Sequence, residues 1–275
     1  MILFPPAKIN LGLRILRKRA DGFHDLDTVF YPTALTDVLE ILPSSHPSNT
    51  AVELKVSGIV PTGDPEGNLC VKAWRLLKAD HQQLPPVYMH LHKNIPTGAG
   101  LGGGSADGAY ALRGLNEKFK LGLTREQLIE YAAQLGSDCP FFIYDEPCVG
   151  SGRGEILKPI SLSLNGYQLV LVNPDIHVST KEAFAGIHPN DQVKSVRSIM
   201  EQPIDTWQDE LLNDFEASIF PNHPEIARIK QQLLDAGAVY ASMSGSGSSV
   251  YGIFKDKPGQ FMMEDRYVIY NGLGG

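Results

Sequence analysis

Residues 8–16 alternate between two faces with the period of a β-strand. One face is apolar and consists of Ile9, Leu11, Leu13 and Ile15. The other is polar or lacks a side chain and consists of Lys8, Asn10, Gly12 and Arg14. We expect this second face to meet water or a ligand. Residues 52–56 and 87–91 alternate in the same way and predict two half-buried antiparallel strands.

Helices are predicted where an apolar stripe follows a capping or starting residue, at Asn68, Thr124, Ser179 and Pro224. Thr124 and Ser179 are each followed three residues later by Gln or Glu, which fits a capping box. The helix that begins at Pro224 is expected to end before Gly237. Because strands and helices are mixed without a strict alternation, the sequence predicts an α+β fold.

Composition narrows the choice of partners. The chain has 275 residues, and its 31 acidic side chains outnumber 24 basic ones, for a net charge of −7. This balance argues against nucleic-acid binding, which needs basic side chains to neutralise phosphates. No apolar run approaches the roughly 18 residues of a membrane span, so we expect a cytoplasmic protein that does not enter membranes. The three cysteines contain no Cys-x-x-Cys pair, and we interpret them as reduced thiols.

A glycine-rich segment carries the strongest chemical signal. It follows a predicted strand, precedes helix-compatible residues 110–117, and reads Pro96, Thr97, Gly98, Ala99, Gly100, Leu101, Gly102, Gly103, Gly104, Ser105 and Ala106. Glycines let the backbone approach phosphate oxygens, and the start of the following helix directs free N–H groups at an anion. The segment is therefore predicted to bind a polyphosphate.

Other phosphate-binding loops fit the segment less well. Gly98, Gly100 and Gly103 have the spacing of the dinucleotide fingerprint, which keeps a Rossmann dehydrogenase as an alternative. However, the preceding strand carries His90 and His92 at alternate positions, unlike a strand that is buried on both faces. The chain contains no Gly-Lys-Ser, Gly-Lys-Thr or His-Arg-Asp sequence, which excludes a Walker A loop and a protein kinase.

The segment from Pro96 to Ala106 resembles the ATP motif of the GHMP kinase superfamily, Pro-x-x-x-Gly-Leu-Gly-Gly-Gly-Ser. Gly108 departs from the helix-forming residue that is more usual there, at a cost of about 1 kcal/mol of helix stability relative to Ala. The resemblance implies an ATP-binding domain over residues 1–153, a second domain over residues 154–275, and ligands in the cleft between the domains. It also implies contacts from Asn68 and Lys93 near the adenine and ribose, and from Ser105 to phosphate or Mg²⁺.

Three further segments resemble the superfamily branch that phosphorylates 4-diphosphocytidyl-2-C-methyl-D-erythritol. Residues 7–11 match its first motif, with Lys8 as a catalytic cation. Residues 136–142 match the segment that carries the catalytic base, here Asp138. Residues 244–249 match the glycine loop over the transfer site. From residue chemistry alone, an isolated Lys8 would be interpreted as a surface lysine and Asp138 at least equally well as a turn or cap residue. A serine-rich hairpin loop is an equally good interpretation of residues 244–249.

The same branch holds the cytosine with an aromatic residue and a histidine, which resembles Phe23 and His24 here, opposed by Phe184. The substrate-binding residues implied by the resemblance are Asn10, Phe23, His24, Phe30, Thr180, Phe184, Gly245, Ser246 and Gly247. Phe23 replaces a more common tyrosine, so a ring face is kept and a hydroxyl group is lost.

The resemblance thus implies an ATP- and Mg²⁺-dependent kinase that phosphorylates the 2-hydroxyl of this cytidyl alcohol in non-mevalonate isoprenoid precursor synthesis. No protein ligand of a metal is assigned, because His90 and His92 lack a third partner. Two alternatives remain. One is a GHMP kinase that acts on homoserine, mevalonate or a sugar. The other is a nucleotide-binding protein without catalysis, which would not need Lys8 and Asp138 together.

Overall fold

The computed structural model describes residues 1–44, 52–59, 65–258 and 268–273. Its contacts divide the chain into two compact units. Unit 1 contains Met1–Ala7, Leu35–Thr97 and Gly102–Asp145, and unit 2 contains Lys8–Ala34, Gly98–Leu101 and Glu146–Gly275. The predicted domain boundary at residue 153 stays a prediction. The two compact units are each built from three separate segments and are not divided at that residue. Most of the N-terminal strands β2 (Pro6–Lys18) and β3 (His24–Thr36) belongs to unit 2.

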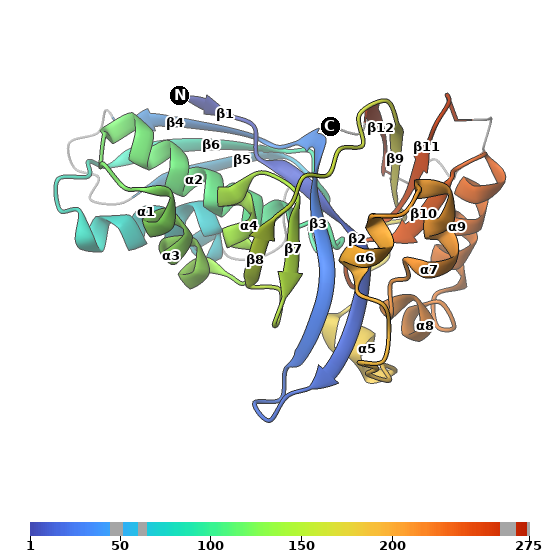
Figure 1. The fold of residues 1–275 in the computed structure, drawn as a ribbon. Coiled ribbons are helices and arrows are strands. Elements are labelled where there is room, and N and C mark those ends of the chain that lie inside the picture. The colour runs from blue at the N-terminus through green and yellow to red at the C-terminus, as the bar shows by residue number, and fades with distance from the viewer. Residues whose placement is uncertain (45–51, 60–64, 259–267, 274–275) are drawn as a thin grey trace. The chain divides into compact units, whose positions relative to one another are not determined.

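Unit 1 is a four-stranded sheet with helices on one side (Figure 1). The strands, in spatial order, are β1 (Ile2–Leu3), β4 (Val38–Pro43), β6 (Val87–Lys93) and β5 (Glu53–Gly58). The helices are η1 (Pro65–Gly67), α1 (Leu69–Asp80), α2 (Gly103–Phe119), α3 (Arg125–Leu135) and α4 (Cys139–Tyr144). β6 is antiparallel to β4 but parallel to β5. The prediction that residues 52–56 and 87–91 form antiparallel strands was therefore wrong for the β5–β6 pair. α1 returns the chain to the end of the sheet at which β5 starts, so β6 runs in the same direction as β5.

The predicted helix starts in unit 1 are confirmed. The side chain of Asn68 accepts a hydrogen bond from the Cys70 N–H at 2.9 Å and caps α1. Thr124 and Gln127 form both bonds of the capping box that opens α3. These caps satisfy N–H groups that have no partner within the helix.

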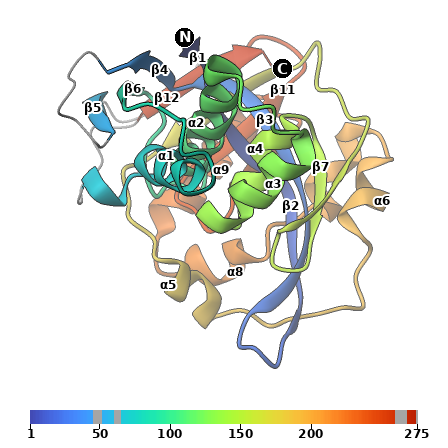
Figure 2. The same ribbon diagram turned by 90° about the vertical axis from the view of Figure 1, so that its left-hand side faces the viewer.

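Unit 2 contains two four-stranded sheets and short helices (Figures 1 and 2). One sheet has the order β2, β3, β7 (Cys148–Ser151) and β8 (Ile156–Pro159). The other has the order β10 (Tyr240–Met243), β11 (Val250–Phe254), β9 (Gln168–Asn173) and β12 (Val268–Leu273). The helices are α5 (Thr180–Ala185), α6 (Val196–Met200), η2 (Ile204–Thr206), α7 (Trp207–Glu210), α8 (Phe215–Ile219) and α9 (Pro224–Asp235).

The core of unit 2 forms where α9 covers β10 and β11. Ile226, Ile229 and Leu233 of α9 are fully buried, which confirms the stripe predicted for the helix that starts at Pro224. Ser179 caps α5 as expected by accepting the Glu182 N–H at 3.1 Å. The Glu182 carboxylate instead contacts His223 at 2.8 Å.

The polar face of β2 is buried rather than open to water. Lys8 and Asn10 are only 4% and 2% exposed. The Asn10 amide donates to the Thr28 hydroxyl at 3.0 Å, and the Tyr251 hydroxyl donates to the Asn10 carbonyl oxygen at 2.7 Å. Hydrogen bonds within the protein therefore replace the water expected on this face.

Gly108 allows α1 and α2 to pack closely. A Cβ atom at position 108 would lie 2.7 Å from the Cβ of Leu69, closer than real side chains approach. The glycine that weakens the isolated helix is thus required by its packing.

We predict that Gly108→Ala lowers the free energy of unfolding. Alanine would favour the helix by about 1 kcal/mol. Overpacking of a close helix contact costs about 1–3 kcal/mol, and the Leu69 Cβ cannot rotate away. Urea denaturation measures the net effect. Gly104→Ala is the control, because a Cβ there meets no atom within 4 Å. Equal or greater stability of Gly108→Ala would contradict the packing argument.

Candidate active site

The ammonium group of Lys8 lies against the glycine-rich segment in unit 2. Its Nζ donates to Asn10 Oδ1 at 2.5 Å and to the Gly100 carbonyl oxygen at 2.9 Å. The Lys8 N–H also donates to the Leu101 carbonyl oxygen at 2.9 Å. Main chain and side chain together therefore attach the start of β2 to residues 98–101.

The loop between β10 and β11 binds the same stretch. The Ser244 hydroxyl donates to the Gly100 carbonyl oxygen at 2.9 Å, and the Ser249 N–H donates to that of Ala99 at 3.2 Å. A Cβ at position 100 would lie 2.1 Å from the Ser244 carbonyl oxygen, and Gly100 has a φ of 78°. Only glycine can occupy this position without displacing the backbone.

Asn213 holds this loop in place and was not identified from the sequence. Its amide donates to the carbonyl oxygens of Met243 and Gly245 at 2.7 and 2.9 Å. A Cβ at Gly245 would lie 3.4 Å from both Lys8 Nζ and Asn10 Oδ1. Ser246 is half-buried, and Gly247 has a φ of 92°. Unit 2 therefore brings Lys8 and Asn10 together with residues 98–101 and 244–249, and the roles of these residues stay predictions.

In unit 1, the glycine-rich segment runs directly into α2. The helix begins at Gly103, earlier than expected, after Gly102 in the left-handed region at φ 69°. No side chain caps this helix start, and a Cβ on Gly104 would meet no atom within 4 Å. The uncapped helix start, the open space at exposed Gly104 and the positive end of the helix dipole fit a polyphosphate.

Asp138 directly precedes α4 and is half-buried. Its carboxylate makes no capping bond to that helix. The Cys139 thiol next to it interacts with the Ser105 side chain, which connects the start of α4 with the first turn of α2. Burial raises the pKa of Cys139 to about 11, so this thiol is not a nucleophile. Lys8 belongs to unit 2, and its pairing with Asp138 stays a prediction.

Lys93 lies between two buried carboxylates. Its ammonium contacts Asp37 and donates to Asp107 Oδ2 at 2.7 Å. Asp37 Oδ1 also accepts the N–H groups of Asn94 and Ile95 at 2.6 and 2.8 Å. Asp107 Oδ1 has no hydrogen-bond partner among the described residues. The predicted nucleotide contact of Lys93 stays a prediction, and its ammonium serves an internal cluster here.

The cluster holds one cation for two carboxylates, and Asp107 is the less well bonded of the two. The pKa of Asp107 is raised to about 7, mainly by burial. The attraction of Lys93 lowers this pKa and the repulsion from Asp37 raises it, so Lys93 offsets the rise only in part. Burial alone would lower the pKa of Lys93, yet Asp107 and Asp37 together raise it. Sequence reasoning missed both aspartates, since only the fold brings them together.

Two residues of the predicted cytosine clamp, His24 and Phe184, stack directly on each other in unit 2. The rings of His24 and Phe184 stack with centroids 4.7 Å apart and planes at 19°. Rings at this separation are in direct contact, so no base fits between them in this arrangement. Phe184 also meets the edge of Phe215 at 4.9 Å. The clamp stays a prediction, and a base would have to displace His24 or stack elsewhere.

The remaining predicted substrate residues of unit 2 differ in exposure. Phe30 is buried, with Lys8 Nζ 5.4 Å from its ring centroid. Thr180 is exposed at the start of α5. Phe23 is 52% exposed, and the guanidinium of Arg153 lies 4.7 Å from its ring centroid.

Among the described residues, no group of three or more His, Cys, Asp and Glu side chains is placed to hold a metal ion. His90 and His92 both contact the Ser57 hydroxyl at 2.9 Å. No described helix is long and apolar enough to cross a membrane.

Comparison with known proteins decides the family. Residues 68–146 match the GHMP kinases N terminal domain, and residues 195–261 match the GHMP kinases C terminal domain. A Bacteroides thetaiotaomicron protein named 4-diphosphocytidyl-2-C-methyl-D-erythritol kinase is 53% identical over 255 residues, 93% of this chain and 92% of that protein. The chain belongs to the GHMP kinase family.

Solved structures of GHMP kinases agree with the fold. A crystal structure of 4-(cytidine 5'-diphospho)-2C-methyl-D-erythritol kinase superposes with a TM-score of 0.80 at 32% identity, over 92% of this chain and 90% of that one. A homoserine kinase from Cytophaga hutchinsonii superposes at 0.72 with 15% identity, over 100% and 94%, and shows the fold alone. The predicted α+β GHMP kinase fold is confirmed.

We predict that stability falls as pH rises from about 5.5 to about 8, in part through Asp107. The unfolded carboxyl titrates near 3.8 and the folded one at about 7, so the folded state binds more protons between these values. The free energy of unfolding then falls by up to about 1.4 kcal/mol per pH unit until pH 7 is passed. Urea denaturation across this range should show a smaller fall in Asp107→Asn. Identical pH profiles would mean that Asp107 titrates normally.

Proposed function

We propose that this chain transfers the γ-phosphate of ATP to the 2-hydroxyl of 4-diphosphocytidyl-2-C-methyl-D-erythritol and yields the 2-phosphate. The observation that carries the proposal is 53% identity to a kinase of that name across 92% of its length. The uncapped first turn of α2, with open space at Gly104, supports a phosphate donor on this chain. The reaction belongs to non-mevalonate isoprenoid synthesis, and a cytoplasmic location stays a prediction.

The nucleotide phosphates would be held by backbone N–H groups at the start of α2 and by the preceding glycines. Ser105 lies in the first turn and would contact phosphate or Mg²⁺. Mg²⁺ would reach the site with ATP and neutralise charge on the transferred group. Asn68 and Lys93 are proposed on the adenine and ribose side, although the Asn68 side-chain oxygen is already used to cap α1.

Phosphoryl transfer needs an oriented nucleophile and a stabilised charge more than covalent help. We assign Asp138 as the base that accepts the proton of the 2-hydroxyl. Lys8 is a buried ammonium that is fixed by Asn10 and the Gly100 carbonyl, and it would stabilise negative charge on the substrate oxygen. Because its position is already determined in the protein, little reorganisation is needed during the reaction.

The two alternatives are less well supported. Homoserine and mevalonate kinases share the fold at 15% and 14% identity, which carries no information on substrate. A nucleotide-binding protein without catalysis would have no need of Lys8 together with Asp138.

Incubation with ATP, Mg²⁺ and the cytidyl alcohol tests the function, with the product followed by phosphorus NMR. We expect a new phosphomonoester signal and stoichiometric ADP. Homoserine and mevalonate serve as competing acceptors. Phosphorylation of either of these, with the cytidyl alcohol left unchanged, would assign the chain to another branch.

We predict that Asp138→Asn lowers kcat by about 10²-fold or more and leaves the KM for ATP nearly unchanged, because a base acts only on the reacting proton. Steady-state kinetics with both substrates measures this effect. Asp209→Asn, at an exposed position of α7, is the matched control and should behave as the unchanged protein. Full turnover in Asp138→Asn would exclude Asp138 as the base.

A further inference from the structure

Asn213 lies beside β2 in unit 2, in the stretch of chain between α7 and α8. The main chain on both sides of it is bonded to that strand. The Leu13 N–H donates to the Leu212 carbonyl oxygen at 2.9 Å, and the Asp214 N–H donates to the Leu13 carbonyl oxygen at 2.8 Å. Asp214 Oδ2 also accepts the Ile15 N–H at 2.7 Å. The backbone of Asn213 is therefore held in place relative to β2.

The side chain of Asn213 bonds to the loop between β10 and β11 on both sides of Ser244. Its amide donates to the carbonyl oxygens of Met243 and Gly245 at 2.7 and 2.9 Å, and its Oδ1 accepts the Phe215 N–H at 3.0 Å. Asn213 is 2% exposed and Ser244 is fully buried. Because these groups lie away from water, the loss of a donor would leave buried carbonyl oxygens partly unsatisfied.

Bonds within the same loop determine its shape. The Ser244 N–H donates to the Ser249 carbonyl oxygen at 2.9 Å, and the Gly247 N–H donates to that of Ser244 at 3.0 Å. These bonds close the turn on itself. The amide bonds of Asn213 instead join the loop to a segment that is attached to β2, so they locate Ser244 relative to that strand.

The contacts of Ser244 return to β2. Its hydroxyl donates to the Gly100 carbonyl oxygen at 2.9 Å, and the same oxygen accepts the Lys8 ammonium at 2.9 Å. Lys8 belongs to β2. The bonds therefore form a closed series within unit 2, from β2 through Asn213, Ser244 and Gly100 back to Lys8. A shift of Ser244 would change the environment of the ammonium through the acceptor that they share.

We propose that Asn213 is a positioning residue for the phosphate transfer, which it supports by holding the Ser244 hydroxyl on the Gly100 carbonyl oxygen. This inference rests on the proposed function, in which Lys8 stabilises charge on the substrate oxygen. Asn213 acts through Ser244 and Gly100, and its effect is on the position of the Lys8 ammonium. Such an effect can be large, because a misplacement of about 1 Å can cost about 10²-fold in rate.

Steady-state kinetics of Asn213→Ala test the effect on turnover. We expect kcat per folded protein to fall about tenfold or more, with the folded fraction taken from urea denaturation. The KM for ATP should stay within about threefold, since the proposed phosphate contacts lie at the start of α2 in unit 1. Asn213→Asp is the second variant, because it removes the amide donors but keeps the acceptor for the Phe215 N–H.

Asn116→Ala is the matched control for loss of stability. The Asn116 amide donates to the Leu123 carbonyl oxygen at 3.1 Å, and its Oδ1 accepts the Leu123 N–H at 2.9 Å. This asparagine thus also bonds to main chain, but near the last turn of α2 in unit 1. We expect Asn116→Ala to be less stable than the unchanged protein and to keep its kcat per folded protein.

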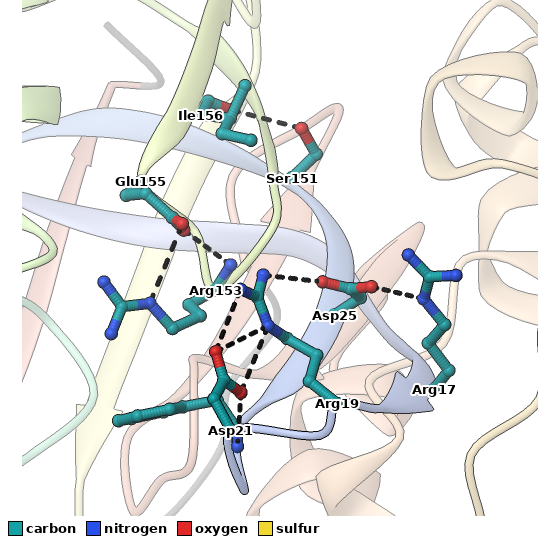
Figure 3. Close-up of polar contacts among 9 residues, drawn as sticks. Arg17, Arg19, Asp21, Asp25, Ser151, Arg153, Glu155 and Ile156 are labelled. Atoms are coloured by element: carbon teal, nitrogen blue, oxygen red, sulfur yellow. Dashed lines mark hydrogen bonds and ion pairs between the residues drawn. The ribbon is translucent and has the colours of Figure 1, made fainter.

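A double-mutant cycle with Ser244→Ala separates positioning from a general structural role. If Asn213 acts through the Ser244 hydroxyl, Asn213→Ala should lower kcat by less than about threefold in the Ser244→Ala background. Independent effects would multiply instead. Ser151→Ala is the control for Ser244→Ala, because the Ser151 hydroxyl also donates to a carbonyl oxygen, that of Ile156 at 3.4 Å (Figure 3). In this background Asn213→Ala should keep its full effect.

Three results would overturn the proposal. They are an unchanged kcat in both Asn213 variants, an equal fall of kcat in Asn116→Ala, and effects of Asn213→Ala and Ser244→Ala that multiply. Each of these would leave the proposed function intact, since the unchanged protein would still phosphorylate the cytidyl alcohol. Absence of turnover in the unchanged protein would contradict the proposed function, and this inference with it.

Discussion

The carbonyl oxygen of Gly100 accepts hydrogen bonds from the Lys8 ammonium and the Ser244 hydroxyl, and much of the organisation of unit 2 depends on this atom. A carbonyl oxygen has two lone pairs, so both are used. The donors come from segments at opposite ends of the chain, while the acceptor belongs to a loop that must lack a side chain at this point. Loss of one donor would leave a buried acceptor partly unsatisfied, at a cost of about 1–3 kcal/mol. This shared acceptor connects the segments around Lys8, Gly100 and Ser244 within unit 2.

Unit 1 has a comparable centre in the buried contacts of Lys93 with Asp37 and Asp107. Asp37 accepts two backbone N–H bonds besides its contact with the ammonium, whereas Asp107 Oδ2 accepts a bond from the ammonium and Asp107 Oδ1 has no partner among the described residues. Burial, together with the repulsion from Asp37, raises the pKa of Asp107, and a proton on this carboxyl would reduce the negative charge of the cluster. Because Asp107 lies on α2, the protonation of this cluster affects the helix whose first turn faces the proposed phosphates.

Features that depend on neighbouring residues could be predicted from the sequence, and those that depend on the path of the chain could not. The caps of α1 and α3 involve atoms within three residues of Asn68 and Thr124, so local patterns were sufficient. The alternation in residues 52–56 reports burial and carries no information on strand direction, so the parallel pairing of β5 with β6 was missed. From the sequence, Gly108 was expected only to lower helix stability. The packing that requires it involves Leu69, which is distant in sequence.

The same distinction applies to the candidate site. Lys8 and the glycine segments could be recognised because their motifs are contiguous in the sequence. Asn213, Asp37 and Asp107 act through partners far along the chain and belong to no motif that marks them. Buried polar residues that hydrogen-bond a binding loop from a distant part of the chain leave no local sequence pattern. They are recognised from their burial and their hydrogen bonds in the structure.

The direct stack of His24 on Phe184 bears on how specificity arises. A base that enters this stack exchanges a contact between two protein rings for a contact between a ring and the base. The net gain is the difference between two similar stacking energies, each of about 1 kcal/mol. Stacking on Phe184 alone therefore adds little affinity, although hydrogen bonds to the base can still select cytosine.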